Sequence, residues 1–165
     1  MQRRLLLAQC GAWALAGCGF ELRKAPTFAF DSIYVNVPES SPLANELKRN
    51  LASLKSLQLI TDPAQQSKAQ VVLEIPIELR EKTVVGVNAS GQVREFQIRL
   101  RVHFLLRTPQ GKVLIPETEI LQQRDISFNE SAVLAKEAEE GLMYRDMQSD
   151  IVQQLLRRLA AVKSL

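Results

Sequence analysis

Apolar and polar residues alternate along four stretches of the chain, the pattern of half-buried β-strands. In the clearest stretch, residues 96–106, apolar side chains take every even position, and the odd positions up to 103 carry Gln97, Arg99, Arg101 and His103. The other three predicted strands are residues 32–37, 71–79 and 113–128, and residues 57–60 form a short apolar run that would be an additional strand.

The stretch 71–79 carries a proline within its alternating pattern. Val71, Leu73, Ile75, Ile77 and Leu79 are predicted to share one apolar face. Pro76 has no backbone N–H to give to a neighbouring strand, so it predicts either an edge position or a bulge.

Two stretches show the spacing of amphipathic helices. The first begins after Ser41, a favoured N-cap residue, and has Pro42 in its first turn. The second is capped by Asn129 or Ser131 and contains Gly141, a candidate bend. Their apolar stripes are Leu43, Leu47, Leu51 and Leu54 in the first helix, and Met147, Ile151, Leu155, Leu159 and Val162 in the second.

The predicted order of elements is therefore β-α-β-β-β-α. We predict an α+β fold, a two-layer sandwich in which two amphipathic helices pack on one face of a four-stranded, mostly antiparallel sheet. Residues 31–165 are long enough for one domain with a substantial core.

The first 17 residues have the layout of a signal peptide. Arg3 and Arg4 precede an uncharged apolar run that is too short to span a bilayer. The run ends in Leu15-Ala16-Gly17-Cys18, which resembles the lipobox of bacterial lipoproteins. This resemblance implies removal of residues 1–17, with Cys18 becoming an N-palmitoyl, S-diacylglycerol cysteine, and we interpret residues 18–30 as the lipidated N-terminus and tether. The alternative is an ordinary signal peptide with a chance cysteine.

A lipid anchor at Cys18 would hold the protein on a membrane. Each buried methylene of an acyl chain contributes about 0.8 kcal/mol, so several chains anchor firmly where one binds marginally. The second mature residue is Gly19 and not Asp. In lipoproteins an Asp at this place retains the protein at the inner membrane, so the resemblance implies an outer-membrane location facing the periplasm.

The apparent basicity of the chain belongs mostly to the predicted signal peptide. The chain has 21 Lys and Arg against 18 Asp and Glu, and residues 1–17 hold two arginines and no acid, so 19 basic against 18 acidic residues remain after cleavage. Nucleic-acid-binding domains carry a clear basic surplus, and we predict no nucleic-acid partner. Cys10 would leave with the signal peptide and Cys18 would be acylated, which leaves no cysteine for a disulfide, a metal site or a nucleophile.

The sequence contains no catalytic constellation. His103 is its one histidine and lies on the polar face of a strand, without neighbours that indicate a triad or a metal site. Glu137, Glu139 and Glu140 lie close together on a helix, where carboxylates usually form a solvated face. We therefore predict no enzyme activity, no metal and no cofactor.

Arg99 and Arg101 share the polar face of one strand beside His103. Two interpretations stay open. The arginines either pair with Glu74 and Glu78 across the ladder or meet an anionic partner such as a phosphorylated glycolipid, because guanidinium binds phosphate through paired hydrogen bonds.

Several segments resemble the family of lipopolysaccharide-assembly lipoproteins, LptE. They are residues 18–23 (CGFELR), 90–96 (SGQVREF), 132–137 (AVLAKE) and 153–159 (QQLLRRL). The predicted order of elements also agrees with the family, so the resemblance covers essentially the whole mature chain.

The resemblance implies a fold and a task. Members of the family are two-layer α+β domains that sit as a plug inside the outer-membrane β-barrel LptD, assist its assembly, and help to insert lipopolysaccharide into the outer leaflet. A polar barrel interior would explain the mixed polar outer faces of the predicted strands and helices. LptD and lipopolysaccharide are therefore the expected partners.

The resemblance also implies two basic contacts with lipopolysaccharide. The first falls on Lys136, in the segment 132–137. The second lies in the family's hairpin, where the turn 88–91 of this chain has no basic residue, and Arg94 is the nearest substitute.

Other functions remain as alternatives. Another outer-membrane lipoprotein, acting as an accessory factor in barrel-protein assembly or in the regulation of cell-wall synthesis, would share the anchor and the size. A lipid-modifying enzyme would need a nucleophile–base pair or a metal cluster, and a soluble lipid carrier would need a large internal cavity.

Overall fold

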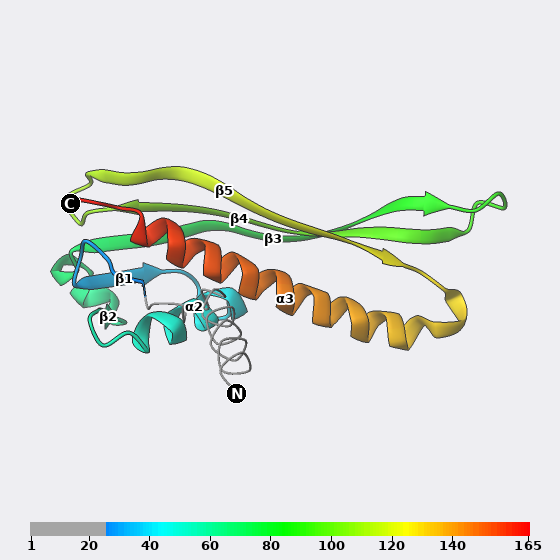
Figure 1. Ribbon diagram of the computed structural model, residues 1–165, viewed down its shortest axis with the longest axis horizontal. Coiled ribbons are helices and arrows are strands. Elements are labelled where there is room, and N and C mark those ends of the chain that lie inside the picture. Colours follow the sequence, from blue (N-terminus) through cyan, green and yellow to red (C-terminus); the bar gives the residue numbers. More distant parts are fainter. Residues whose placement is uncertain (1–25) are drawn as a thin grey trace, which may run out of the picture.

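The computed structural model describes residues 26–165, so the predicted signal peptide and Cys18 lie outside it. The elements are β1 (Ser32–Asn36), α2 (Pro42–Ala52), β2 (Gln58–Ile60), the 3-10 helix η1 (Pro63–Lys68), β3 (Val71–Val87), β4 (Val93–Arg107), β5 (Val113–Ser127), the 3-10 helix η2 (Glu130–Ala132) and α3 (Val133–Ala160). Within these residues the strands form one sheet in the order β2-β1-β3-β4-β5. Figure 1 shows α2 and α3 on the same face of this sheet.

The α+β class is confirmed, but the prediction of a four-stranded, mostly antiparallel sheet is wrong. The sheet of the described region has five strands and is mixed: β1 pairs in parallel with both β2 and β3, and β3, β4 and β5 pair antiparallel. The connection from β1 through α2 to β2 is a βαβ unit, which requires parallel strands. Periodicity could not assign β2, because it has only three residues.

A bulge at Pro76 changes which face β3 presents. β3 pairs with β1 only from Val71 to Glu74, and its register with β4 shifts between Glu74 and Ile77. One extra residue reverses the alternation of side chains beyond it. The prediction that Ile77 and Leu79 share the core face is therefore wrong: they lie on the open face of the sheet, 40% and 46% exposed.

The core lies between the sheet and the two helices. Its centre is β4, whose even-numbered residues from Ile98 to Leu106 are fully buried, as the alternation predicts. The predicted helix stripes are also confirmed, with Leu54 and Val162 partly buried at their ends. Each large apolar side chain that folding buries contributes roughly 1.5–3 kcal/mol, so this layer is the main source of stability. Phe28 and Phe30, in the predicted tether, stack at 5.2 Å and pack against the same core.

Ser41 fixes the start of α2 as the sequence predicts. Its Oγ accepts a hydrogen bond from the backbone N–H of Ala44 at 2.9 Å, and Pro42 occupies the first turn. The same hydroxyl donates to the Glu78 carboxylate on β3. The N-cap therefore also ties α2 to the sheet.

Candidate functional site

The start of α3 folds back against the end of β5. Asn129 makes this turn, because its side-chain oxygen accepts hydrogen bonds from the backbone N–H and the hydroxyl of Ser131, at 3.0 and 2.8 Å. The single turn η2 follows and α3 begins at Val133. Lys136, one turn into the helix, consequently lies beside Ser127, the last residue of β5.

The ammonium group of Lys136 is held by two neighbours. Its Nζ donates to Ser127 Oγ at 3.0 Å and forms an ion pair with Glu139 Oε2 at 2.8 Å. The side chain is partly buried, and the contact with Ser127 keeps its charge at the junction of β5 and α3. Lys136 is therefore a positioned cation rather than a fully exposed lysine.

Arg94, on β4, lies next to the residue that follows β5. Its backbone carbonyl accepts a hydrogen bond from the N–H of Phe128 at 2.7 Å, and Phe128 directly follows the serine that binds Lys136. Arg94 is exposed, and no ion pair to it is found within residues 26–165. The structure thus brings together two predicted site residues that are 42 positions apart in the sequence.

The tip of the β3–β4 hairpin closes without a basic residue, as the sequence indicates. Asn88 Oδ1 accepts hydrogen bonds from the N–H groups of Ser90 and Gln92, and Gly91 adopts a φ of +81°, which favours glycine. Figure 1 shows this tip and the start of α3 at one end of the molecule, and the C-terminus at the other.

Lys82 is a third cation at this end that sequence reasoning missed. It lies on β3, its Nζ is 2.6 Å from Glu140 Oε2 on α3, and the same atom lies 4.4 Å from the centre of the Phe96 ring. The bulge at Pro76 turns Lys82 toward the helices. Pro76 was therefore the one feature of the sequence that could have indicated the orientation of Lys82. A cavity of about 50 Å³ between these elements is lined by both Lys82 and Lys136, with Phe96 and Phe128.

A groove along α3 continues from this cavity. It has a volume of about 470 Å³ and is lined by Arg80, Lys82, Glu140 and Tyr144, among others. The Arg80 guanidinium lies 5.0 Å from the centre of the Tyr144 ring, and the Tyr144 hydroxyl donates to the backbone carbonyl of Glu81 at 2.9 Å. Burial, with the nearby Glu140 carboxylate, raises the pKa of the Tyr144 phenol above its usual value.

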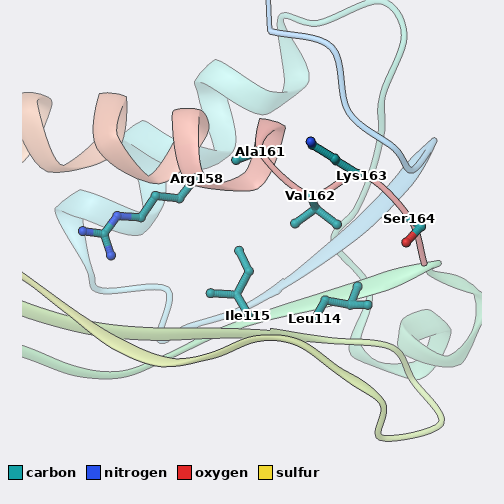
Figure 2. A pocket seen from close by; sticks show the side chains of 7 residues that line it. All are labelled: Leu114, Ile115, Arg158, Ala161, Val162, Lys163 and Ser164. Carbon is teal, nitrogen blue, oxygen red and sulfur yellow. The ribbon is translucent and has the colours of Figure 1, made fainter.

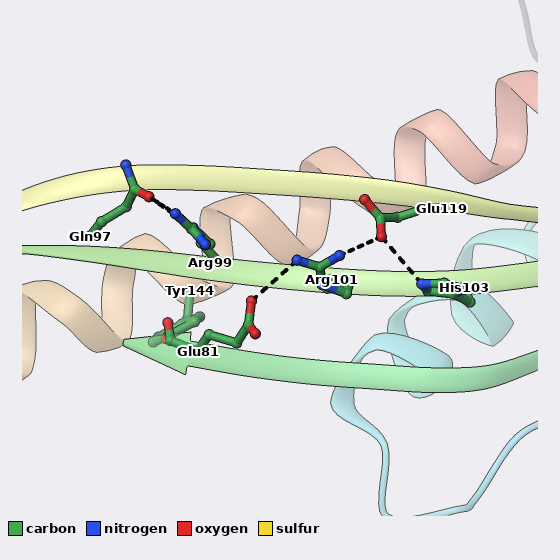
Figure 3. Close-up of polar contacts among 7 residues, drawn as sticks. All are labelled: Glu81, Gln97, Arg99, Arg101, His103, Glu119 and Tyr144. Atoms are coloured by element: carbon green, nitrogen blue, oxygen red, sulfur yellow. Dashed lines mark hydrogen bonds and ion pairs between the residues drawn. The ribbon is translucent and has the colours of Figure 1, made fainter. Parts of the chain in front are cut away.

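The open face of the sheet carries a chain of charged side chains (Figure 3). Arg101 lies 2.6 Å from Glu119 and 3.6 Å from Glu81, and His103 Nε2 lies 3.3 Å from the same Glu119 carboxylate. The hydrogen bond to Glu119 raises the pKa of the Arg101 guanidinium, which therefore stays charged.

The pairing predicted for the arginines of this face is wrong. Glu74 pairs with Arg107 at 2.6 Å, and Glu78 accepts from Ser41. Arg99 donates to the side-chain oxygen of Gln97. The predicted pairing fails because the bulge at Pro76 moves Glu78 to the helix-covered face, while Glu81 takes its place on the open one.

The described residues include several positively charged side chains but no candidate metal centre. Within residues 26–165, no group of three or more His, Cys, Asp or Glu side chains is placed to hold a metal ion. Over the same residues, no helix is long and apolar enough to cross a membrane. What the arrangement offers chemically is cations beside apolar and aromatic side chains, which suits binding of a phosphorylated amphiphile.

Comparison with known proteins identifies the family. The profile of the family described as "LptE: Lipopolysaccharide-assembly" matches residues 30–159. An LPS-assembly lipoprotein LptE from Yersinia enterocolitica is 29% identical and covers 98% of this chain and 78% of its own length. The LPS-assembly lipoprotein LptE of Photorhabdus laumondii is 27% identical, over 98% of this chain and 88% of its own.

Solved structures share the fold of this chain. A lipoprotein B from Nitrosomonas europaea superposes with a TM-score of 0.73 at 30% identity, over 87% of this chain and 91% of that one. The rare lipoprotein B from Shewanella oneidensis shares the fold, with a TM-score of 0.64 at 19% identity, over 79% of this chain and 95% of that one. The family predicted from the sequence segments is confirmed: the chain belongs to the LptE family of lipopolysaccharide-assembly proteins.

Proposed function

We propose that this protein is an outer-membrane lipoprotein that acts in lipopolysaccharide assembly. The observation that carries the proposal is the match of residues 30–159 to the LptE family, together with relatives named as LPS-assembly lipoproteins along 98% of the chain. In this proposal Cys18 carries the lipid anchor, and the protein works by binding and not by catalysis. Its location is the periplasmic side of the outer membrane.

The proposed lipid site is the junction of β4, β5 and α3. Lys136 and Arg94 contribute two cations there, and Lys82 is a third, which lines a small cavity together with Lys136. A phosphate group would replace Glu139 as the partner of Lys136 and pair with the free guanidinium of Arg94. Val133, one helical turn before Lys136, lines the same cavity, is 37% exposed and offers an apolar contact for an acyl chain.

The proposed protein partner is the β-barrel LptD, in whose lumen the domain would sit as a plug. The open face of the sheet supports this proposal, because some of its charges are already paired with one another, as in the group of Arg101, Glu119 and Glu81. Docking against a polar barrel wall would bury these paired charges together with their partners.

Lipopolysaccharide binding is tested with charge-reversal variants of the complete protein. The double variant Lys136→Glu/Arg94→Glu is expected to lose lipopolysaccharide binding by at least tenfold, since each phosphate contact contributes roughly 1.5 kcal/mol or more. The matched control is Lys48→Glu/Arg49→Glu on α2, which makes the same change in net charge far from the site. Unchanged binding by the first variant would refute both site residues.

The barrel partner is tested by mild detergent extraction of tagged protein from its own membranes. A heat-sensitive complex with one large β-barrel is the expected result. Recovery with factors of barrel assembly or cell-wall synthesis would support the alternative function as an accessory lipoprotein. Loss of membrane association in a Cys18→Ser variant tests the anchor separately.

A further inference from the structure

We propose that the cleft between the end of α3 and the beginning of β5 binds an acidic glycerophospholipid. The acyl chain would lie on Leu114, Ile115 and Val162, and the headgroup phosphate would be held by Arg158 and Lys163. This site is separate from the proposed lipopolysaccharide site and does not depend on it.

The apolar part of the cleft comes from two elements that meet without closing. Val162 follows the end of α3 and points toward Leu114 and Ile115 on β5 (Figure 2). The β4–β5 register is irregular here, and Leu114 has no partner residue on β4. The cleft measures about 440 Å³, within the range of roughly 300–1,000 Å³ that ligand sites occupy.

The charged part of the cleft is positive and not neutralised. Arg158 and Lys163 line it, and no acidic residue does. The Arg158 guanidinium lies 5.6 Å from the centre of the Phe104 ring and extends away from Lys163 (Figure 2), so it would turn toward Lys163 to share a phosphate. Within residues 26–165 no ion pair to either side chain is found, whereas Lys82 and Lys136 at the other end each pair with a glutamate. Charge complementarity therefore favours an anionic occupant at this end of the molecule.

The helix dipole does not account for this arrangement by itself. Basic residues in a last helical turn stabilise the helix, which is sufficient for Arg157 and Arg158. Lys163, however, lies beyond the end of α3, and the dipole does not require an apolar wall beside the cations. Both features follow if an anionic headgroup and an acyl chain bind together.

The size of the cleft favours a glycerophospholipid over lipopolysaccharide. One apolar wall and two cations match a single phosphate with part of one acyl chain, not a glycolipid with many chains. Arg158 also lies 22 residues along α3 from Lys136, about 33 Å at 1.5 Å per residue. One headgroup cannot contact both.

The test uses soluble short-chain lipids and the full chain carrying Cys18→Ser, which removes the predicted acylation position. Dihexanoyl-phosphatidylglycerol is expected to shift the NMR methyl signals of Ile115 and Val162, and dihexanoyl-phosphatidylcholine to do so much more weakly. Arg158→Gln/Lys163→Gln is expected to weaken phosphatidylglycerol binding by roughly tenfold or more, the usual effect of losing charge-assisted contacts. Ile115→Ser, which changes no charge, is expected to weaken it severalfold.

Matched variants and competitors distinguish lipid binding in the cleft from attraction by net charge and from a site for free anions. Lys48→Gln/Arg49→Gln should bind like the parent, and an equal loss in this pair would overturn the proposal in favour of net charge alone. Displacement by inorganic phosphate at the same concentration would overturn it in favour of a free-anion site. Loss of lipopolysaccharide binding in the cleft variant would overturn the choice of ligand. If the double variant does not fold, Lys163→Gln alone replaces it, because this residue is exposed. It should also weaken phosphatidylglycerol binding, and unchanged binding would overturn the proposal.

Discussion

Lys136 shows how a lysine predicted from a family segment acquires a defined position. The hydrogen bond to Ser127 and the ion pair with Glu139 hold its ammonium group at the end of β5. The identity of the residue came from sequence, but its neighbours come from the turn that Asn129 makes between β5 and α3. The ion pair with Glu139 leads to a prediction about affinity.

Removing the carboxylate of Glu139 should strengthen the binding of anionic lipid. In Glu139→Gln the ammonium of Lys136 no longer has a competing partner, so we expect lipopolysaccharide affinity to rise by roughly two- to fivefold, in keeping with a partly exposed ion pair of about 0.5–1 kcal/mol. Titration with labelled lipopolysaccharide measures the change. Glu39→Gln makes the same charge change at an exposed position outside this cavity, and an equal gain there would show that only net charge matters.

Tyr144 links α3 to the free edge of β3 through one hydrogen bond. Tyr144→Phe removes the bond to the Glu81 carbonyl and should lower the free energy of unfolding by about 1 kcal/mol at neutral pH. Because burial raises the pKa of the phenol, the folded chain keeps this proton to higher pH than the unfolded chain does. Stability from this source is therefore complete below pH 10 and is lost as pH rises above that value.

Thermal unfolding at a series of alkaline pH values measures this effect. The parent protein should lose stability above pH 10 more steeply than Tyr144→Phe does. Identical slopes in the two proteins would contradict the role of the phenol.

At the scale of elements, α3 is longer and more regular than its sequence indicates. The helix runs unbroken from Val133 to Ala160 through Gly141, where the sequence had placed a candidate bend. A Cβ atom at Gly141 would meet no atom within 4 Å. Glycine at this position therefore lowers the stability of the helix without being needed for packing.

Two glycine-to-alanine substitutions should have opposite effects. Gly141→Ala is expected to stabilise the protein by about 0.5–1 kcal/mol, because alanine loses less backbone entropy in a helix. Gly91→Ala is expected to destabilise it by about 1 kcal/mol, because the φ of +81° is unfavourable for a residue with a Cβ. Urea unfolding of both variants measures the difference, and effects of the same sign would contradict these assignments.

The strands show what alternation can and cannot specify. It correctly placed the buried and polar faces of β4, because β4 continues without a bulge from Phe96 to Phe104. It failed for β3 beyond Pro76: Ile75 is buried as predicted, but the bulge turns Ile77 and Leu79 to the open face although the pattern looks regular in sequence. Pro76 indicated a bulge or an edge, but not what the bulge would do to the residues after it.

At the scale of the whole molecule, the domain has a well-packed end and a thin end. The core gathers where both helices cover the sheet, and the β3–β4 hairpin continues past it (Figure 1). Along the hairpin arm Val84, Val85 and Val87 are each about half exposed, whereas Ile98 on β4 is fully buried. The arm is therefore held chiefly by backbone hydrogen bonds.

Hydrogen exchange should reveal this gradient. Backbone amides of residues 84–95 are expected to exchange much faster than those of residues 98–106, because local opening of the arm exposes little apolar surface. Mass spectrometry after timed deuterium labelling measures it. Lipopolysaccharide, if it binds beside Arg94, should slow exchange in the arm, and equal protection along all of β4 would contradict the gradient.

The sequence by itself determined the α+β class, the two amphipathic helices, the N-cap at Ser41 and the family, because these depend on local periodicity, capping and short motifs. The prediction of a four-stranded, mostly antiparallel sheet was wrong, because the parallel pairing of β1 with β2 and β3 depends on contacts between segments far apart in the chain. Only the tertiary structure decided which charged side chains pair. The reason is the extra residue at Pro76, after which each side chain of β3 points to the opposite face of the sheet. That inversion brings Lys82 to α3, and the turn at Asn129 brings Lys136 and Arg94 to one end, so the candidate site is set by register and chain reversal rather than by motif.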